Sequence, residues 1–317
     1  MINAGNPKAA ETSVLQTDAG RGAGRLFRRI LAAGKGGERE VMKKETLTVS
    51  GWTTGDTELR IGFIIVGIVL ALGIVSVFYT PHDVYEMNTS LRSQAPSLTH
   101  FFGTDNFGRD VFSRAMVGAR FTLLVSASTI LLATGISILL GLACGYIGGM
   151  VDEVVMRIMD AVNSFPSILI ALVMVSVLNY GKLTIIPALV IMFIPSFTRI
   201  VRTGTLQYKN ADFVLSNKVF GDSDLRILFV HILPNIYPLL LSSIVIGLSN
   251  AILAESSMSY LGLGIQPPIP SWGRMLKEAQ DIIFSTPWAA IAPGMMIVLT
   301  IVGLNCIGEG IRKKYLS

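Results

Sequence analysis

The chain contains long apolar runs without a single Asp, Glu, Lys or Arg, and these runs restrict its fold more than any other feature. A helix that crosses the hydrocarbon core of a membrane needs about 20 mostly apolar residues. Six runs approach or exceed that length, and they cover residues 61–79, 121–147, 166–180, 183–197, 232–254 and 288–307. Of the 317 residues, 51% are hydrophobic and 15% are charged, against about 25% charged in soluble domains. The sequence therefore predicts an all-α membrane protein with about six transmembrane helices.

The segment between the second and third runs carries charge. Each Asp, Lys or Arg at the centre of a transmembrane helix costs about 2.5–3.5 kcal/mol. Asp152, Arg157 and Asp160 would together cost about 8–10 kcal/mol. We therefore expect residues 148–165 to lie outside the hydrocarbon core or to be enclosed by protein.

The fourth run contains Pro187 and Pro195, although neighbouring helices can satisfy a backbone group that a proline leaves without a partner. Arg199 and Arg202 follow this run directly. Because charge is costly inside a span, their position predicts that the fourth span ends before Arg199.

Basic residues gather on one side of the predicted spans. If the amino terminus is cytoplasmic, 19 of the 26 Lys and Arg residues fall in cytoplasmic segments, as the positive-inside rule requires. Without residues 1–60, nine Lys and Arg residues fall in cytoplasmic segments and seven in external segments, so the charge bias depends mostly on residues 1–60. We expect a multi-pass membrane protein with both termini in the cytoplasm. The basic residues lie at the ends of apolar runs rather than along one polar face, which argues against nucleic-acid binding and leaves lipid as the surrounding medium.

The segment 1–60 is polar and basic. It lacks the apolar stretch of a cleaved secretory signal, and its composition predicts a largely disordered tail. Residues 25–31 alternate basic and apolar side chains and either form a short amphipathic helix on anionic headgroups or remain solvated with the rest of the tail.

Cysteines and histidines give no metal motif. Cys144 and Cys306 both lie within long apolar runs, where a thiol behaves as a small hydrophobe. His82, His100 and His231 are far apart along the chain and have no Cys partner at metal-ligand spacing. The sequence therefore predicts no metal site.

The segment 213–235 reads FVLSNKVFGDSDLRILFVHILPN. Gly221 stands between two helix-forming pieces, where a residue without Cβ permits a left-handed turn. The segment predicts a helix, a turn and a second helix that protrude from the membrane. On its own, the pattern fits an ordinary loop between spans equally well.

This segment resembles the EAA loop of binding-protein-dependent permeases, in which Ile-Leu-Pro follows a glycine. Leu215-Ser216-Asn217 stand where that family carries Glu or another residue followed by Ala-Ala. The resemblance implies a coupling helix that docks on an ATPase. The residues that it assigns to coupling are Asp212, Phe213, Val214, Leu215, Ser216, Asn217, Gly221, Arg226 and Pro234.

This role makes Gly221 the critical position of the segment. If its φ is positive, valine there should strain the turn by about 1–2 kcal/mol and reduce uptake. The same change at Gly204, outside the turn, should be milder.

Three further segments resemble the dipeptide, oligopeptide and nickel permease family. They read HFFGTDNFGRDVFSR from His100, GGMVDEVVMRIMDAVNSFP from Gly148 and ESSMSYLGLGIQPPIPSWGRML from Glu255. Their order along the chain is similar to that of the C-type subunit, over about residues 60–315. The resemblance implies the type I ABC importer permease fold with a cytoplasmic coupling helix. It divides the chain into a cytoplasmic basic tail (1–60), a first transmembrane helix with an external segment (61–120) and a core permease domain with five transmembrane helices (121–317) that contains the EAA-like loop (211–235).

The resemblance implies a non-catalytic subunit of an ATP-driven importer in the bacterial cytoplasmic membrane. With a second permease subunit it would form the pathway for peptides or a related solute such as nickel or a metal chelate. The other implied partners are two ATPase subunits, which use ATP and Mg, and an extracytoplasmic solute-binding protein. The chain itself should bind no cofactor and hydrolyse no ATP, because Gly34-Lys35 and Gly181-Lys182 lack the other residues of a phosphate-binding loop.

Asp105, Arg109 and Glu255 are candidates for the translocation path or a gate. Asp105, Arg109 and Asp110 could equally pair with one another across a turn in an external loop. Glu255 follows an apolar run near the membrane edge, and an ionisable residue there predicts a functional or pairing role.

Two other functions compete with import. A secondary transporter needs ionisable residues within several spans, and the six apolar runs contain none. A membrane-embedded enzyme would carry H-E-x-x-H or G-x-S-x-G on a span, and neither occurs in the runs.

Overall fold

The structure is a computed structural model that describes residues 51–177 and 185–316. The chain divides into two units, Met1–Thr54 and Gly55–Ser317, and nearly all described residues belong to the second. The predicted disordered tail up to residue 50, including the basic stretch at 25–31, lies outside the described residues. Helix α2 (Gly51–Phe78) begins ten residues before the first predicted run.

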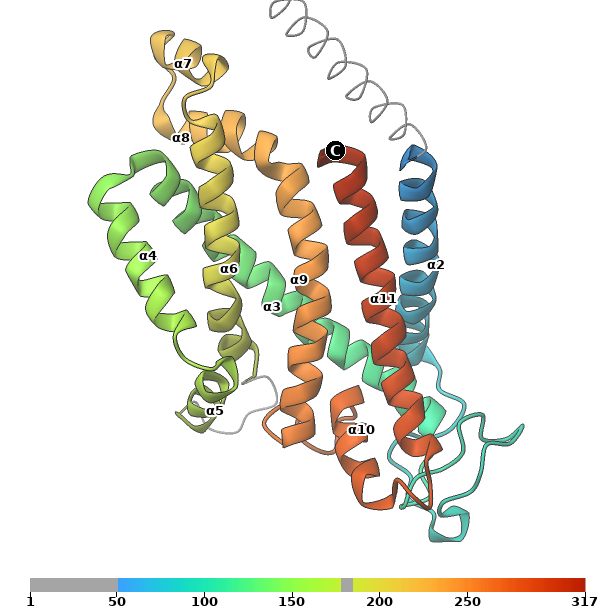
Figure 1. The fold of residues 1–317 in the computed structure, drawn as a ribbon. Coiled ribbons are helices and arrows are strands. Elements are labelled where there is room, and N and C mark those ends of the chain that lie inside the picture. Colours follow the sequence, from blue (N-terminus) through green and yellow to red (C-terminus); the bar gives the residue numbers. More distant parts are fainter. Residues whose placement is uncertain (1–50, 178–184, 317) are drawn as a thin grey trace, which may run out of the picture. The chain divides into compact units, whose positions relative to one another are not determined.

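Helices build the fold, and the described part of the chain contains no β-strand (Figure 1). The α-helices after α2 are α3 (Val111–Ile147), α4 (Gly149–Asn163), α5 (Ser167–Val177), α6 (Ile185–Tyr208), α7 (Asp212–Val219), α8 (Asp224–Arg226), α9 (Leu233–Leu261), α10 (Trp272–Ala279) and α11 (Trp288–Leu316). A π-helical turn at Ile227–Ile232 joins α8 to α9. The predicted all-α class is confirmed.

Five of the described helices are long and apolar enough to cross a membrane. They are α2, α3, α6, α11 and the continuous helix Asp224–Leu261 that contains α8 and α9. They cover the first, second, fifth and sixth predicted runs to within a residue and the described part of the fourth, from Ile185 onward.

The third predicted run does not form an uninterrupted span within the described residues. Helix α5 has 11 residues, so at about 1.5 Å per residue it is roughly half as long as the hydrocarbon core is thick. It reaches the length of a span only together with α4, and the two helices are bent by 89° at the break between them. The described chain thus has five spans, or six if this bent pair counts as one.

The fourth predicted span lies in a helix that extends beyond the predicted end of the span. Helix α6 continues past Arg199 and Arg202 to Tyr208, and Pro195 lies inside it. Both arginines are neutralised by helix α4, because Arg202 binds Asp152 through two hydrogen bonds of 2.5 and 2.6 Å, and Arg199 binds Asp160 at 2.7 Å. Pairing lowers the free-energy cost of both charges near the membrane, so the helix can continue past them.

Helices α3 and α6 pack closely because small residues line their contact. A Cβ built on Gly141 would lie 2.6 Å from the Val201 Cβ, and one built on Gly145 would lie 2.5 Å from the Thr205 Cβ. The two glycines are four residues apart and so lie on one face of α3. This arrangement is the small-residue contact typical of membrane helices.

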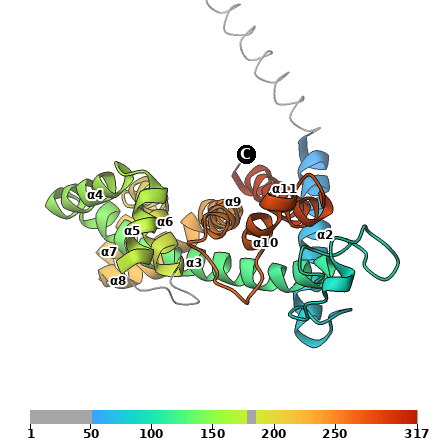
Figure 2. The same cartoon turned by 90° about the horizontal axis from the view of Figure 1, so that it is seen from below.

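Helix α9 packs against α3, α6 and α11. Figures 1 and 2 both show α9 between α6 and α11, with α3 crossing the set. Short helix α10 packs against α3, α9 and α11. Its Trp272 is fully buried, and the Trp272 Nε1–H donates a 3.0 Å hydrogen bond to the Ala115 carbonyl of α3.

The bundle has two different ends. Helices α7 and α8 lie at the same end as the carboxyl end of α11 (top of Figure 1), and α10 lies at the opposite end with the segment 79–110. Lys313 near the end of α11 binds Glu58 near the start of α2 at 2.7 Å. The beginning of the first span and the end of the last span therefore share the α7 end.

Candidate functional site

The predicted helix, turn and helix at 211–235 is present, and its first helix is α7. Asp212 lies in the first turn of α7 and Lys218 in the last, so both charges oppose the partial charges of the helix ends. The other coupling candidates of this helix, Phe213, Val214, Leu215, Ser216 and Asn217, are consecutive residues of α7.

Gly221 ends α7 with a left-handed backbone, since its φ is +87°. The Gly221 N–H donates to the Lys218 carbonyl at 3.1 Å, and the Asp222 N–H donates to the Asn217 carbonyl at 3.0 Å. This pair of hydrogen bonds is the Schellman cap, which satisfies carbonyls that a helix end leaves open. No atom lies within 4 Å of a Cβ built on Gly221, so the backbone angle alone favours glycine here.

One face of α7 is anchored in the bundle. Val214 is fully buried and belongs to the same apolar cluster as Ile227, Ile232 and Ile236 of the following helix, with Tyr208 packed against it. This contact holds α7 against the start of the long Asp224–Leu261 helix.

The rest of α7 and its turn present large apolar side chains to the surface. Val219 and Phe220 are each 86% exposed. Leu215 on α7 and Leu225 on α8 are exposed as well. We call these four residues the apolar tip. Grouped exposed apolar side chains of this kind mark an interaction surface.

Polar contacts fix α7 and α8 to the end of α3. The Tyr146 hydroxyl donates to Asp224 Oδ1 at 2.5 Å, and the Lys218 ammonium lies 4.7 Å from the centre of the Tyr146 ring. Lys209 Nζ donates to the Gly145 carbonyl at 3.2 Å. Helix α7 is thus connected to α3 as well as to α9.

The remaining coupling candidates lie beyond the turn. Arg226 is in α8, where its Nη1 lies 3.4 Å from Asp222 Oδ1, and His231 Nε2 lies 3.3 Å from Asp222 Oδ2. Pro234 is the second residue of α9 and follows directly after the π-helical turn. The structure therefore brings all nine coupling candidates to one end of the bundle, on three consecutive helical pieces.

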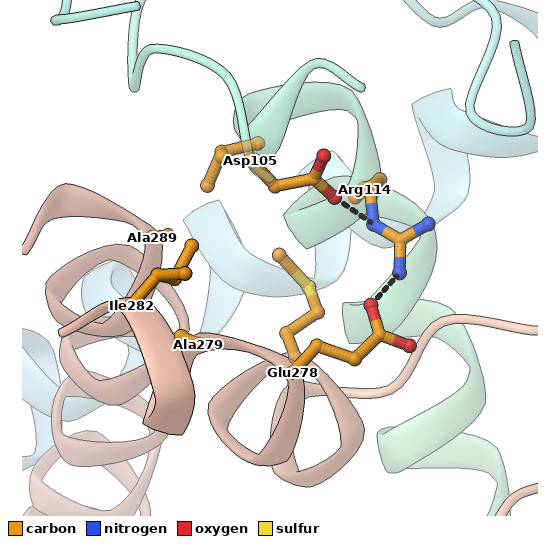
Figure 3. Close-up of a pocket in the computed structure, with 8 residues that line it drawn as sticks. Asp105, Arg114, Glu278, Ala279, Ile282 and Ala289 are labelled. Atoms are coloured by element: carbon orange, nitrogen blue, oxygen red, sulfur yellow. Dashed lines mark hydrogen bonds and ion pairs between the residues drawn. The ribbon is translucent and has the colours of Figure 1, made fainter. Parts of the chain in front are cut away.

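At the opposite end, Asp105 and Arg109 belong to a buried ionic cluster, of which Figure 3 shows Asp105, Arg114 and Glu278. Arg109 Nε donates to Asp105 Oδ2 at 2.7 Å, so these two residues pair across the turn, whereas Asp110, the third residue of that alternative, lies against His100. Glu278 of α10 joins the cluster, because its Oε2 accepts from Arg109 Nη2 at 2.7 Å and from Arg114 Nη2 at 2.8 Å. Its Oε1 accepts from Arg274 at 3.1 Å.

This cluster clamps the segment 79–110 and the start of α3 onto α10. The hollow beside it, which Figure 3 shows, is lined by Asp105, Arg114, Glu278 and apolar neighbours, and its volume is about 10 Å³. A space of that size holds about one water molecule. The hollow is thus too small for a peptide, and the geometry favours a fastening role for Asp105 and Arg109.

Glu255 is fully buried in α9. Its carboxylate accepts hydrogen bonds from the Ser259 hydroxyl at 2.6 Å and from the Ser256 hydroxyl at 3.4 Å. The hydroxyls of Thr122 on α3 and Ser271 before α10 also reach it. Four hydroxyls therefore replace the water that a buried carboxyl group loses.

Comparison with known proteins gives the family. Residues 137–315 match the family described as binding-protein-dependent transport system inner membrane component, and these residues make up more than half of the chain. The chain belongs to this family. It is a membrane-embedded transport permease of the ABC importer type and not an enzyme.

Three transport permeases are similar to this permease over most of their own length. The dipeptide transport system permease protein DppC of Alkalihalophilus pseudofirmus is 36% identical over 83% of this chain and 89% of its own. The oligopeptide transport system permease protein OppC of Bacillus subtilis is 33% identical over 89% of this chain and 93% of its own. The glutathione transport system permease protein GsiD of Pectobacterium atrosepticum is 35% identical over 77% of this chain and 82% of its own.

The family match includes all the coupling candidates and Glu255, whereas Asp105 and Arg109 precede it. Several residues that hold this permease together were missed by sequence reasoning. Glu278 is 169 positions from its partner Arg109, and Tyr146 is 78 positions from Asp224. No local pattern indicates such pairs. The spacing of Gly141 and Gly145 is the one signal that was available, since small residues four apart favour close helix packing.

Proposed function

We propose that this permease pairs with a second permease subunit, that the two enclose the pathway of an importer for peptides or a similar small solute, and that α7 receives the force of ATP hydrolysis. The relatives carry dipeptide, oligopeptide and glutathione in their names. The proposed solutes also include nickel and metal chelates. Two ATPase subunits, with ATP and Mg, and an extracytoplasmic binding protein complete the assembly.

The observation that carries the proposal is the apolar tip. Val219 and Phe220 are almost fully exposed on a short helix that is capped, anchored and held at the end of the bundle. Water would not favour that arrangement, so a protein partner that covers the tip explains it. An ATPase subunit with a groove for a short helix is the partner that this geometry fits.

Force on α7 has two routes into the bundle. Tyr146 and Lys209 connect the α7 region with α3, and Val214 connects it with the long α9 helix. Movement of α7 therefore tilts α3 and α9 together. Binding of ATP to the ATPases then favours one of two permease conformations, because only differential binding shifts such an equilibrium.

The proposal also orients the protein in the membrane. The α7 end, with the end of α11, faces the cytoplasm, so that both termini are cytoplasmic. The opposite end, with α10 and the segment 79–110, faces the extracytoplasmic binding protein. Lipid and the second permease cover the exposed apolar side chains of α2, α3 and α11.

The test uses the complete transporter. Val219→Asp and Phe220→Asp place a charge in the proposed contact, where a central side chain contributes about 2 kcal/mol or more. We expect each variant to reach the membrane at normal abundance and to capture at least about tenfold less ATPase. Tyr315→Asp is the matched control, since Tyr315 is a 60% exposed aromatic residue on α11. Normal ATPase capture by both α7 variants would refute the proposed docking.

A further inference from the structure

Two of the three histidines lie side by side, although they are 18 positions apart in the sequence. The rings of His82 and His100 have centroids 4.4 Å apart. Asp110, the residue before α3, approaches both, with Oδ1 at 2.8 Å from His100 Nδ1 and Oδ2 at 3.8 Å from His82 Nδ1. One possible ligand atom from each residue lies within 4.8 Å of the other two.

The burial and the supporting hydrogen bonds of these three side chains resemble those of metal ligands. His100 and Asp110 are buried, and the His82 side chain is 40% exposed. The Ser113 N–H donates to Asp110 Oδ2 at 2.7 Å, which orients the carboxylate as a hydrogen bond behind a metal ligand does. The Ser113 Oγ accepts from the His82 backbone N–H at 3.1 Å and fixes the position of that residue.

A buried nitrogen in this cluster has no partner. His82 Nδ1 is shielded from solvent and makes no hydrogen bond among the described residues. A buried polar atom without a partner is costly, and such exceptions in native proteins call for an explanation such as a bound ion.

We infer that His82, His100 and Asp110 form a binding site for one divalent transition-metal ion of the Zn²⁺ type. Two imidazoles and one carboxylate suit Zn²⁺ and similar ions, whereas Ca²⁺ and Mg²⁺ prefer oxygen alone. Ligands placed about 2.0–2.2 Å from a tetrahedral ion are about 3.4 Å from one another. The separations of 2.8 and 3.8 Å between the Asp110 oxygens and the two histidines lie on either side of this value, so small movements of the side chains reach it.

The ion joins three neighbouring parts of the chain. His82 follows α2, His100 lies in the segment 79–110, and Asp110 begins α3. The proposed ligands are close in sequence to Asp105 and Arg109 but are separate from the ionic cluster, because Asp105 and Glu278 both bind Arg109. A metal ion here ties the first span to the second at the end opposite α7.

The test is a metal titration of the purified full-length permease, prepared with a tag that contains no histidine. Co²⁺ serves as an optical probe and Zn²⁺ as its competitor. We expect one Co²⁺ per chain with the visible absorption of a tetrahedral site, and its displacement by Zn²⁺. Loss of a hydrogen bond behind a ligand weakens metal binding about 10- to 100-fold, so His82→Ala, which removes a ligand, should weaken it at least about 100-fold.

Two further variants make the test specific. His231→Ala removes the remaining histidine, which lies in the α7 region, and should leave the affinity unchanged. Asp110→Asn keeps a good helix cap and removes the charge, so it should also weaken binding. Zn²⁺ should raise the thermal unfolding temperature of the wild type and of His231→Ala but not of His82→Ala. Absence of saturable binding, or equal binding by the wild type and His82→Ala, would overturn the site.

Discussion

Gly221 is the residue on which the shape of the α7 region depends. Its φ of +87° is a conformation that other residues adopt only with strain. The space around it is open, so a larger side chain disturbs the backbone angle and nothing else. Gly204 differs, because a Cβ there would lie 2.7 Å from the Ile236 Cγ2. The packing therefore opposes the expectation that a change at Gly204 is milder than one at Gly221, since a valine there collides with Ile236 of α9.

The first prediction concerns this turn. Gly221→Val should strain the backbone by about 1–2 kcal/mol, which is too little to unfold the bundle but enough to displace α7. We expect normal abundance in the membrane, with uptake and transport-stimulated ATP hydrolysis reduced together. Gly135→Val is the proper control, because Gly135 lies in α3 with no atom within 4 Å of its Cβ position. Full uptake by Gly221→Val would remove this turn from the mechanism.

Glu278 is a second residue with consequences beyond its own helix. It holds Arg109, Arg114 and Arg274 at once. Its removal leaves two buried guanidinium groups with only Asp105 as a carboxylate partner within the cluster. Breaking a fully buried ion pair costs about 3–5 kcal/mol, and Glu278 should cost less because its side chain is 19% exposed.

The second prediction follows from that count of charges. Glu278→Gln should lower the thermal unfolding temperature of the permease in detergent, since the amide keeps the shape but not the charge. Glu153→Gln is the comparison, because Glu153 is 69% exposed and lies 3.8 Å from Arg157, and surface changes of this kind stay within about 0.5 kcal/mol. Equal unfolding temperatures for the two variants would show that the cluster does not fasten α10.

At the scale of elements, α3, to which α7 is connected, packs closely against α6. Gly141 and Gly145 let the two backbones approach, and Arg202 on α6 binds Asp152 on α4. Hydrocarbon gives little driving force for apolar association, so close packing and polar pairing have to hold membrane helices together. These contacts hold the three helices together.

The third prediction addresses this packing. Gly141→Leu should separate α3 from α6 and destabilise the permease by about 1–3 kcal/mol, the usual cost of overpacking. Thermal unfolding of the purified protein measures the effect. Leu139→Phe, at a position that is 61% exposed on α3, should leave the unfolding temperature almost unchanged. A Gly141→Leu variant as stable as wild type would mean that the helices do not depend on this close approach.

For the whole molecule, function depends on which end faces which side of the membrane. Asn210 lies beside α7, and Pro268 lies between α9 and α10; both are exposed. The two positions therefore report on opposite ends of the bundle. Asn3, which would report on the amino terminus, lies outside the described residues.

The fourth prediction tests that orientation. In a chain whose Cys144 and Cys306 are replaced, single cysteines are placed at Asn210 or Pro268. In intact cells an impermeant thiol reagent should label the cysteine at 268 and not the one at 210. Permeabilised cells, in which both should react, provide the control. Labelling at 210 from outside would reverse the proposed topology.

The sequence alone determined the features whose free energy depends on neighbouring residues. A run of about 20 uncharged apolar residues partitions into hydrocarbon whatever its position in the chain, so five spans were predicted correctly. The glycine at position 221 likewise predicted the turn after α7. Tertiary structure decided what depends on residues far apart. Asp152 on α4 pairs with Arg202 on α6. Glu278 binds arginines from two segments of the chain, and the rings of His82 and His100 lie side by side. These outcomes rest on pairing energies that exist only after the helices pack, and no local pattern of residues contains them.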